Sequence, residues 1–76
     1  MKVILGGFFP KYLEGAPRQF ELSLAAPIRL AELLERLGIP PAEVHMVVVN
    51  GELVEADAAV FKHDDEVRLY PPADGG

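Results

Sequence analysis

Apolar residues recur at two different periods along this chain, and the difference separates strands from a helix. The first apolar run, "VIL", is continuous, as expected for a strand in the centre of a sheet. In "RQFELSL", residues 18–24, every second residue is apolar, so that Phe20, Leu22 and Leu24 share one face. These patterns predict a strand at residues 2–5 and a second, half-buried strand antiparallel to it.

One amphipathic helix is predicted in the middle of the chain. Four leucines recur at the i, i+3, i+4 and i+7 spacing of a single helical face: Leu30, Leu33, Leu34 and Leu37. Pro27 suits the first helical position, because the N–H that it lacks would have no partner there. Gly38 suits the left-handed position after the last turn, which lets Ile39 fold back onto the leucines.

The second half of the chain reads as strands. "VHMVVV" ends at Asn50-Gly51, a strong hairpin signal, and "ELVE" is the expected return strand. Residues 56–62 fit neither period. "KHDDE" reads as a polar turn, and "EVRLY" alternates with Val67 and Leu69 inward before two prolines end the strand.

The order strand, strand, helix, strand, short strand, strand predicts an α+β fold. One leucine stripe and one apolar sheet face make a two-layer domain, with a mixed sheet of four to five strands packed on one main helix. The 76 residues form one domain, 1–76. A chain this small has little interior for an enclosed active site, so it is expected to work at its surface or through an end.

The sheet face away from the helix is a candidate docking surface. If Val3 and Leu5 face the helix, Ile4 points outward. If Val47 and Val49 face inward, a parity that the sequence does not fix, Met46 and Val48 point outward. An uncovered sheet face is usually polar, so an apolar patch there suggests a partner. We expect the partner-binding residues to be Ile4, Met46 and Val48, joined by Arg68 and Tyr70 of the last strand. The alternative is that residues 8–17 cover the patch.

Composition excludes several classes of partner. The formal net charge is −5 and the seven basic residues are scattered, which argues against binding to nucleic acid or to an anionic membrane. There is no cysteine to form a disulfide. The first apolar run is too short for a signal peptide or a transmembrane helix, so a cytoplasmic location is expected.

The residues offer little catalytic chemistry. The chain has no Cys, no Thr and one Ser, Ser23, so a nucleophilic triad is close to excluded and the protein is not expected to be an enzyme. "GGFFPK" lacks the spacing of a phosphate-binding loop, and its glycines are expected to let the backbone bend after the first strand. His45 and His63 do not have a metal-ligand spacing, and no metal site is expected.

Six residues follow Tyr70 and could span up to about 20 Å. Pro71 and Pro72 favour a stiff, extended exit from the sheet. Gly75 and Gly76 have no side chains, so this end could thread a narrow channel and present a carboxylate to another protein's active site. The alternative is an ordinary frayed terminus.

The whole pattern resembles the ubiquitin-like β-grasp family and, within it, the bacterial MoaD/ThiS sulfur carriers. The resemblance covers the full length: the "MKVIL" opening, the "LAELLERLGIP" helix, the "VVVNGELV" hairpin, the "DDEVRLYPP" strand and the final "GG". The "YPPADGG" ending is closer to MoaD, the small subunit of molybdopterin synthase.

The resemblance implies a carrier role for Gly76. A ubiquitin-activating-type enzyme (MoeB/ThiF-like) would use ATP to adenylate the carboxylate of Gly76, and sulfur would then replace AMP to leave a thiocarboxylate. The carrier itself would bind no cofactor. The loaded tail would enter a synthase large subunit (MoaE-like), most simply in molybdopterin biosynthesis. Sulfur delivery to thiamin or another pathway, a ubiquitin-like protein modifier and a β-grasp interaction module that is never activated remain alternatives.

Overall fold

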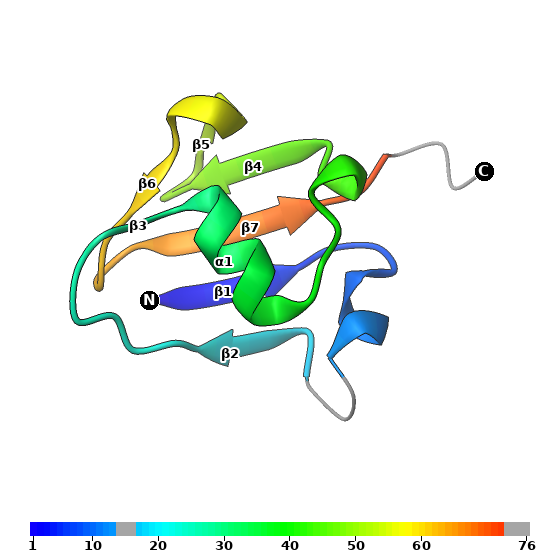
Figure 1. Ribbon diagram of the computed structural model, residues 1–76, viewed down its shortest axis with the longest axis horizontal. Helices are drawn as coiled ribbons and strands as arrows, with labels where there is room; N and C mark the ends of the chain where they lie inside the picture. The colour runs from blue at the N-terminus through cyan, green and yellow to red at the C-terminus, as the bar shows by residue number, and fades with distance from the viewer. Residues whose placement is uncertain (14–16, 73–76) are drawn as a thin grey trace.

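Five strands form the main sheet of the protein, shown in Figure 1. A computed structural model describes residues 1–13 and 17–72. The strands are β1 (Lys2–Leu5), β2 (Gln19–Glu21), β4 (Met46–Val49), β5 (Glu52–Val54) and β7 (Glu66–Tyr70), in the order β2-β1-β7-β4-β5. β1 and β7 are parallel, and the other neighbours are antiparallel. The predicted α+β class with a mixed sheet is therefore confirmed.

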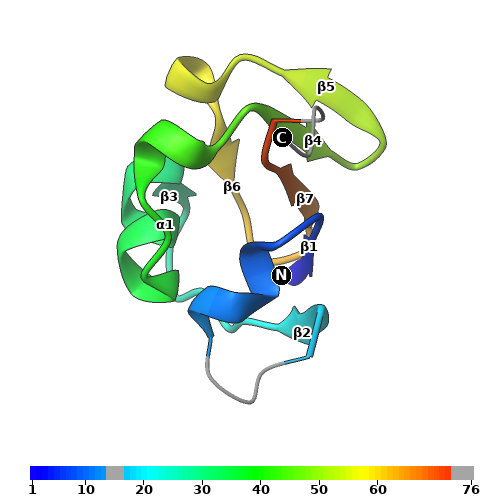
Figure 2. The same ribbon diagram turned by 90° about the vertical axis from the view of Figure 1, so that its right-hand side faces the viewer.

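Helix α1 (Leu30–Leu37) covers one face of this sheet, as Figure 2 shows from the side. Its four predicted leucines are all buried and pack with Val3, Leu5, Val67 and Leu69 of the two central strands. Gly38 is left-handed with φ of 73°, and the Ile39 N–H donates to the Leu34 carbonyl oxygen at 3.0 Å. The leucine stripe, the glycine cap and the fold-back of Ile39 are confirmed.

The helix begins at Leu30, so the expectation that Pro27 opens it is wrong. Residues 28 and 29 form the short strand β3 (Ile28–Arg29), which pairs antiparallel with β6 (Val60–Phe61). Ile28 lies opposite Phe61, and their side chains are 6% and 0% exposed. Burial of these two large apolar side chains is favourable, and it requires Ile28 to be extended rather than helical.

The stretch that fitted neither period contains two short elements. A 3₁₀ helix, η3 (Ala56–Ala58), is followed directly by β6. Two more 3₁₀ helices, η1 (Phe9–Tyr12) and η2 (Pro41–Glu43), are joined by a hydrogen bond that the Tyr12 hydroxyl donates to the Glu43 carboxylate. This bond raises the pKa of Tyr12, because it and the charge of Glu43 favour the neutral phenol.

The predicted hairpin and polar turn lie side by side. Asn50 and Gly51 both have positive φ, 51° and 85°, as a two-residue type I′ hairpin requires. The Asn50 side chain donates to Asp65 at 2.9 Å and accepts from the Glu66 N–H at 2.9 Å. One asparagine therefore fixes both the β4–β5 hairpin and the start of β7.

Candidate functional site

The outer face of the sheet, turned away from α1, carries a continuous row of side chains across all five strands. The register joins Gln19 to Ile4, Ile4 to Arg68, Arg68 to Val48, and Val48 to Leu53. Because side chains of directly paired residues share a face, these five lie next to one another. The sheet therefore brings together three of the five predicted partner-binding residues, Ile4, Val48 and Arg68.

A second outward pair lies beside this row, where Met46 of β4 faces Tyr70 of β7. Met46 is 37% exposed, and Tyr70 is half-buried. The other two predicted partner-binding residues are thus on the same face, at its end nearest the tail. We call Ile4, Met46, Val48, Arg68 and Tyr70, with Leu53, the outer patch.

Leu53 was not predicted to be part of this surface. It is 69% exposed, the most exposed of the large apolar side chains among the described residues. The hairpin signal at Asn50-Gly51 could have found it, because a two-residue turn makes residues 49 and 52 partners and so puts Leu53 opposite Val48.

Arg68 is the one cation in the outer patch. Its guanidinium is raised in pKa by a side-chain hydrogen bond with Tyr70 and by the charge of Glu66, whose carboxylate lies 3.5 Å from Nε. The Arg68 side chain is 43% exposed, so these interactions are screened by water and leave the cation available. The outer patch therefore combines apolar side chains with one exposed positive charge near its centre.

The alternative, that residues 8–17 cover this patch, does not hold for the part of that loop that the structure describes. Phe9 is fully buried in the core, and Tyr12 and Leu13 pack against the same core. Figure 2 shows η1 on the side of the sheet that α1 covers. Among the described loop residues, Phe9, Tyr12 and Leu13 therefore pack on the helix side and not over the outer patch.

The backbone at the end of β7 is hydrogen-bonded from both sides, just where the tail begins. We call Tyr70 and Pro71 the root of the tail, or tail root. The Gly6 N–H donates to the Leu69 carbonyl oxygen at 2.8 Å, and the His45 N–H donates to the Tyr70 carbonyl oxygen at 2.8 Å. Pro71 is buried, whereas Pro72 is exposed. The last strand therefore ends at Tyr70, as predicted, and the chain becomes exposed at Pro72. Gly75 and Gly76 lie outside the described residues.

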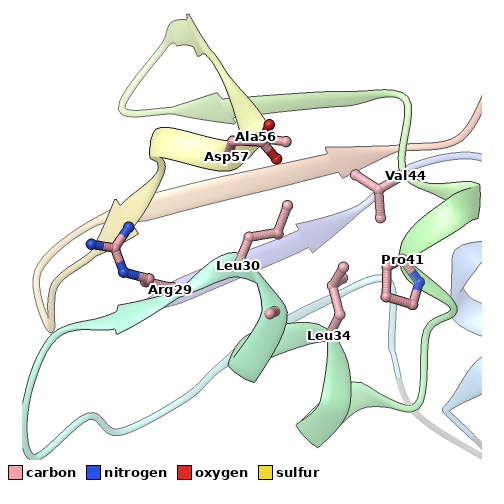
Figure 3. A pocket seen from close by; sticks show the side chains of 8 residues that line it. Arg29, Leu30, Leu34, Pro41, Val44, Ala56 and Asp57 are labelled. Carbon is pink, nitrogen blue, oxygen red and sulfur yellow. The ribbon is translucent and has the colours of Figure 1, made fainter.

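The rest of the surface formed by the described residues offers no comparable arrangement. A hollow of about 270 Å³ lies between α1, η2 and η3, lined by apolar side chains with Arg29 and Asp57 at its edges (Figure 3). His45 and His63 lie near opposite ends of β7, so the structure does not bring them together. Over residues 1–13 and 17–72, no three His, Asp or Glu side chains gather as metal ligands. None of the helices in those ranges has the length and apolar content to cross a bilayer.

Comparison with known proteins gives one family. A family model described as the ThiS family matches residues 7–76, which is nearly the whole chain. A comparison with curated proteins gave no match. The matched range includes the outer patch except Ile4, all of α1 and the glycine tail.

Proposed function

The chain belongs to the ThiS family of sulfur carrier proteins, and from this premise we propose that its sulfur is carried as a thiocarboxylate on Gly76. Carriers of this family are not enzymes, and the family implies an adenylating partner related to ThiF and MoeB. The observation that best supports Gly76 is the arrangement at the end of β7: the backbone is held up to Tyr70, and the glycine pair follows a few residues later. A chain without cysteine also cannot carry sulfur as a persulfide.

Loading takes two steps. A Gly76 carboxylate oxygen attacks the α-phosphorus of ATP, pyrophosphate leaves, and an acyl adenylate forms. A sulfide equivalent then attacks the carbonyl carbon, a C–S bond forms, and AMP leaves with the oxygen that joined it to carbon. The partner supplies ATP, sulfide and the catalytic groups, while this chain contributes a docking surface and a thin tail.

The outer patch is the proposed docking surface for the adenylating enzyme. Four of its six side chains are aliphatic or thioether groups, one is the cation of Arg68, and its Tyr70–Met46 end adjoins the root of the tail. An enzyme that grips this face and extends toward that end would meet the tail. Docking and activation would thus be carried by two different parts of one small domain.

The molecule that finally accepts the sulfur has two candidates, one in thiamin synthesis and one in molybdopterin synthesis. The family match supports a thiamin-type pathway, because the matching family bears the name ThiS. The "YPPADGG" ending supports molybdopterin and a MoaE-like synthase partner as the second candidate. Complementation separates the two: the gene is introduced into a bacterial strain that lacks its thiamin sulfur carrier and into one that lacks its molybdopterin carrier. Restored growth in one strain identifies the acceptor.

The carrier function itself is tested by intact-protein mass spectrometry. The protein is incubated with the adenylating enzyme of its own host, ATP and a sulfide donor. We expect a mass increase equal to one sulfur replacing one oxygen, and no increase when Gly76 is deleted. Heavier conjugates that resist reductant would instead indicate a protein modifier. An unchanged mass with intact binding would indicate an interaction module that is never activated.

A further inference from the structure

The turn after β1 touches the root of the tail at two consecutive glycines. A Cβ built on Gly6 would lie 2.3 Å from Cδ1 of Tyr70, and a Cβ on Gly7 would lie 2.5 Å from Cγ of Pro71. Both separations are far below van der Waals contact, so neither position accepts a side chain unless the tail root moves. We call Gly6 and Gly7 the glycine seat.

Gly6 and Gly7 contact two tail-root residues that face opposite sides of the sheet. Tyr70 follows Arg68 on the outer face, and its ring lies over Gly6. Pro71 continues the inward alternation of Val67 and Leu69, is buried, and packs its ring on Gly7. Two successive residues of the tail root are therefore both held against the end of β1, which restricts both the position and the direction of the exit.

Backbone conformation does not account for both glycines. Gly38 and Gly51 have positive φ with no atom within 4 Å of a built Cβ, so glycine is needed there for the turn alone. Gly7 has φ of +52° and a crowded Cβ position, and Gly6 is crowded without being among the glycines of positive φ. At Gly6 the reason for glycine is the close approach of β7, because a built Cβ would lie 2.3 Å from the Tyr70 ring and 3.2 Å from the Leu69 carbonyl oxygen.

We propose that Gly6 and Gly7 are positioning residues for activation: they set the direction in which the tail leaves the domain and so deliver Gly76 to the partner's ATP. This inference rests on the carrier function proposed above. Because a displacement of about 1 Å at a reacting centre can lower a rate by about a hundredfold, an exit direction set at two points should influence how well the Gly76 carboxylate is placed for reaction. Gly6 contacts Tyr70, which belongs to the outer patch, whereas Gly7 contacts Pro71, which does not. A change at Gly7 should therefore affect kcat rather than docking.

The kinetic test compares Gly7→Ala with Gly51→Ala. Both changes put an alanine at positive φ, but only the first meets another side chain, so Gly51→Ala controls for backbone strain. In the loading reaction we expect Gly7→Ala to lower kcat about tenfold or more with KM within about twofold. Gly51→Ala should leave both constants within about twofold of the parent. Equal constants for the two variants would overturn the proposal.

A second variant, at Pro71, removes the other partner of the same contact, and this test does not depend on whether Gly7→Ala folds. Pro71→Ala removes the Cγ that packs on Gly7, so it should lower kcat without raising KM. Combining it with Gly7→Ala relieves the clash, and the double variant should load no more slowly than Pro71→Ala alone. Strictly multiplicative losses would show that the two positions act independently and would contradict a shared seat.

A measurement without any partner separates failure of this inference from failure of the carrier function. Because the chain has no cysteine, Ala73→Cys gives a unique site for a nitroxide spin label, and amide broadening in NMR spectra then reports where the tail lies. We expect Gly7→Ala to change the pattern of broadened amides and Gly51→Ala to preserve it. An unchanged pattern in Gly7→Ala overturns the seat even if the protein loads sulfur. A changed pattern in a protein that no enzyme loads overturns the carrier function instead.

Discussion

Arg68 of β7 lies directly opposite Val48 of β4 on the outer face of the sheet, and Ile4 of β1 flanks it on the other side. A cation between two apolar side chains is well suited to a partner surface that carries a carboxylate or a carbonyl group within an apolar area. Electrostatic complementarity of this kind selects partners and speeds association more than it raises affinity.

Reversal of this charge should therefore weaken docking. We expect Arg68→Glu to raise the KM for loading by about tenfold or more, because a like charge facing a partner carboxylate costs several kcal/mol. The kcat should change less than KM, because Arg68 is linked to the glycine seat only through Tyr70 and the contact between Gly7 and Pro71 is retained. Steady-state loading kinetics at low and high salt would measure both constants, and the defect should shrink as salt screens the charges.

Arg36→Glu is the matched control for that variant. It makes the same change in net charge on α1, where Arg36 forms an exposed ion pair with Glu32 at 2.8 Å, on the opposite layer of the molecule. Its KM should remain within about twofold of the parent, because Arg36 is not part of the outer patch. The fold should also be retained, because an exposed pair of this kind contributes under about 1 kcal/mol to stability. Equal effects of the two reversals would mean that overall charge, and not the outer patch, controls the reaction.

Leu53 provides an independent test of the same surface. Because its side chain is already 69% exposed, Leu53→Thr should change the free energy of unfolding by no more than about 0.5 kcal/mol. Loss of its apolar contact should raise KM about fivefold, equivalent to about 1 kcal/mol of docking energy. Val60→Thr, at a 42% exposed position in β6 on the helix layer, should leave KM unchanged. A larger effect at Val60 than at Leu53 would indicate that the docking surface lies on the helix layer and not on the outer patch.

The elements that the sequence predicted well are those whose signals are local. The leucine stripe of α1, the turn at Asn50-Gly51 and the alternation of "EVRLY" each depend on neighbouring residues, and each is confirmed. The second strand was predicted over residues 18–24 and is shorter, Gln19–Glu21, although Leu22 and Leu24 still pack against the core. Alternation shows which face is apolar, but it does not show where hydrogen bonding to β1 stops.

The features that the sequence could not show depend on residues far apart in the chain. Strand β3 exists because Ile28 pairs with Phe61, and the local sequence around either residue does not indicate this pairing. The glycine seat likewise requires knowledge that β1 lies parallel to β7, which brings Gly6 beside Tyr70. From the sequence alone, the two glycines indicated only a bend.

The turn before β7 should make the protein sensitive to acid. The pKa of Asp65 is lowered, first by the hydrogen bond from the Lys62 backbone N–H and also by that from the Asn50 side chain. A carboxylate with a lowered pKa in the folded state adds stability above its unfolded pKa of about 3.9, and that stability is lost as the pH falls through the folded value. We expect Asp65→Asn to lose about 1 kcal/mol at pH 7 and to decline less steeply than the parent in acid.

Urea unfolding followed by far-ultraviolet circular dichroism at several pH values would measure this, because the chain has no tryptophan for fluorescence. Asp64→Asn removes the same charge from the neighbouring exposed residue and serves as the control. Its stability at pH 7 should stay within about 0.5 kcal/mol of the parent. If both variants lost equal stability, net charge and not the hydrogen bonds of Asp65 would explain the effect.

Phe61 tests whether the small β3–β6 pair is part of the core. Its side chain is fully buried opposite Ile28, so Phe61→Ala should cost about 3–5 kcal/mol, a large share of the 5–15 kcal/mol that stabilises a typical domain. Phe8→Ala removes the same ring from a position that is 42% exposed and should cost less than about 1 kcal/mol. Thermal and urea unfolding of both variants would measure the difference. A similar loss in each would mean that Phe61 contributes no more than a surface ring, and that the core ends at the α1 leucines and the main sheet.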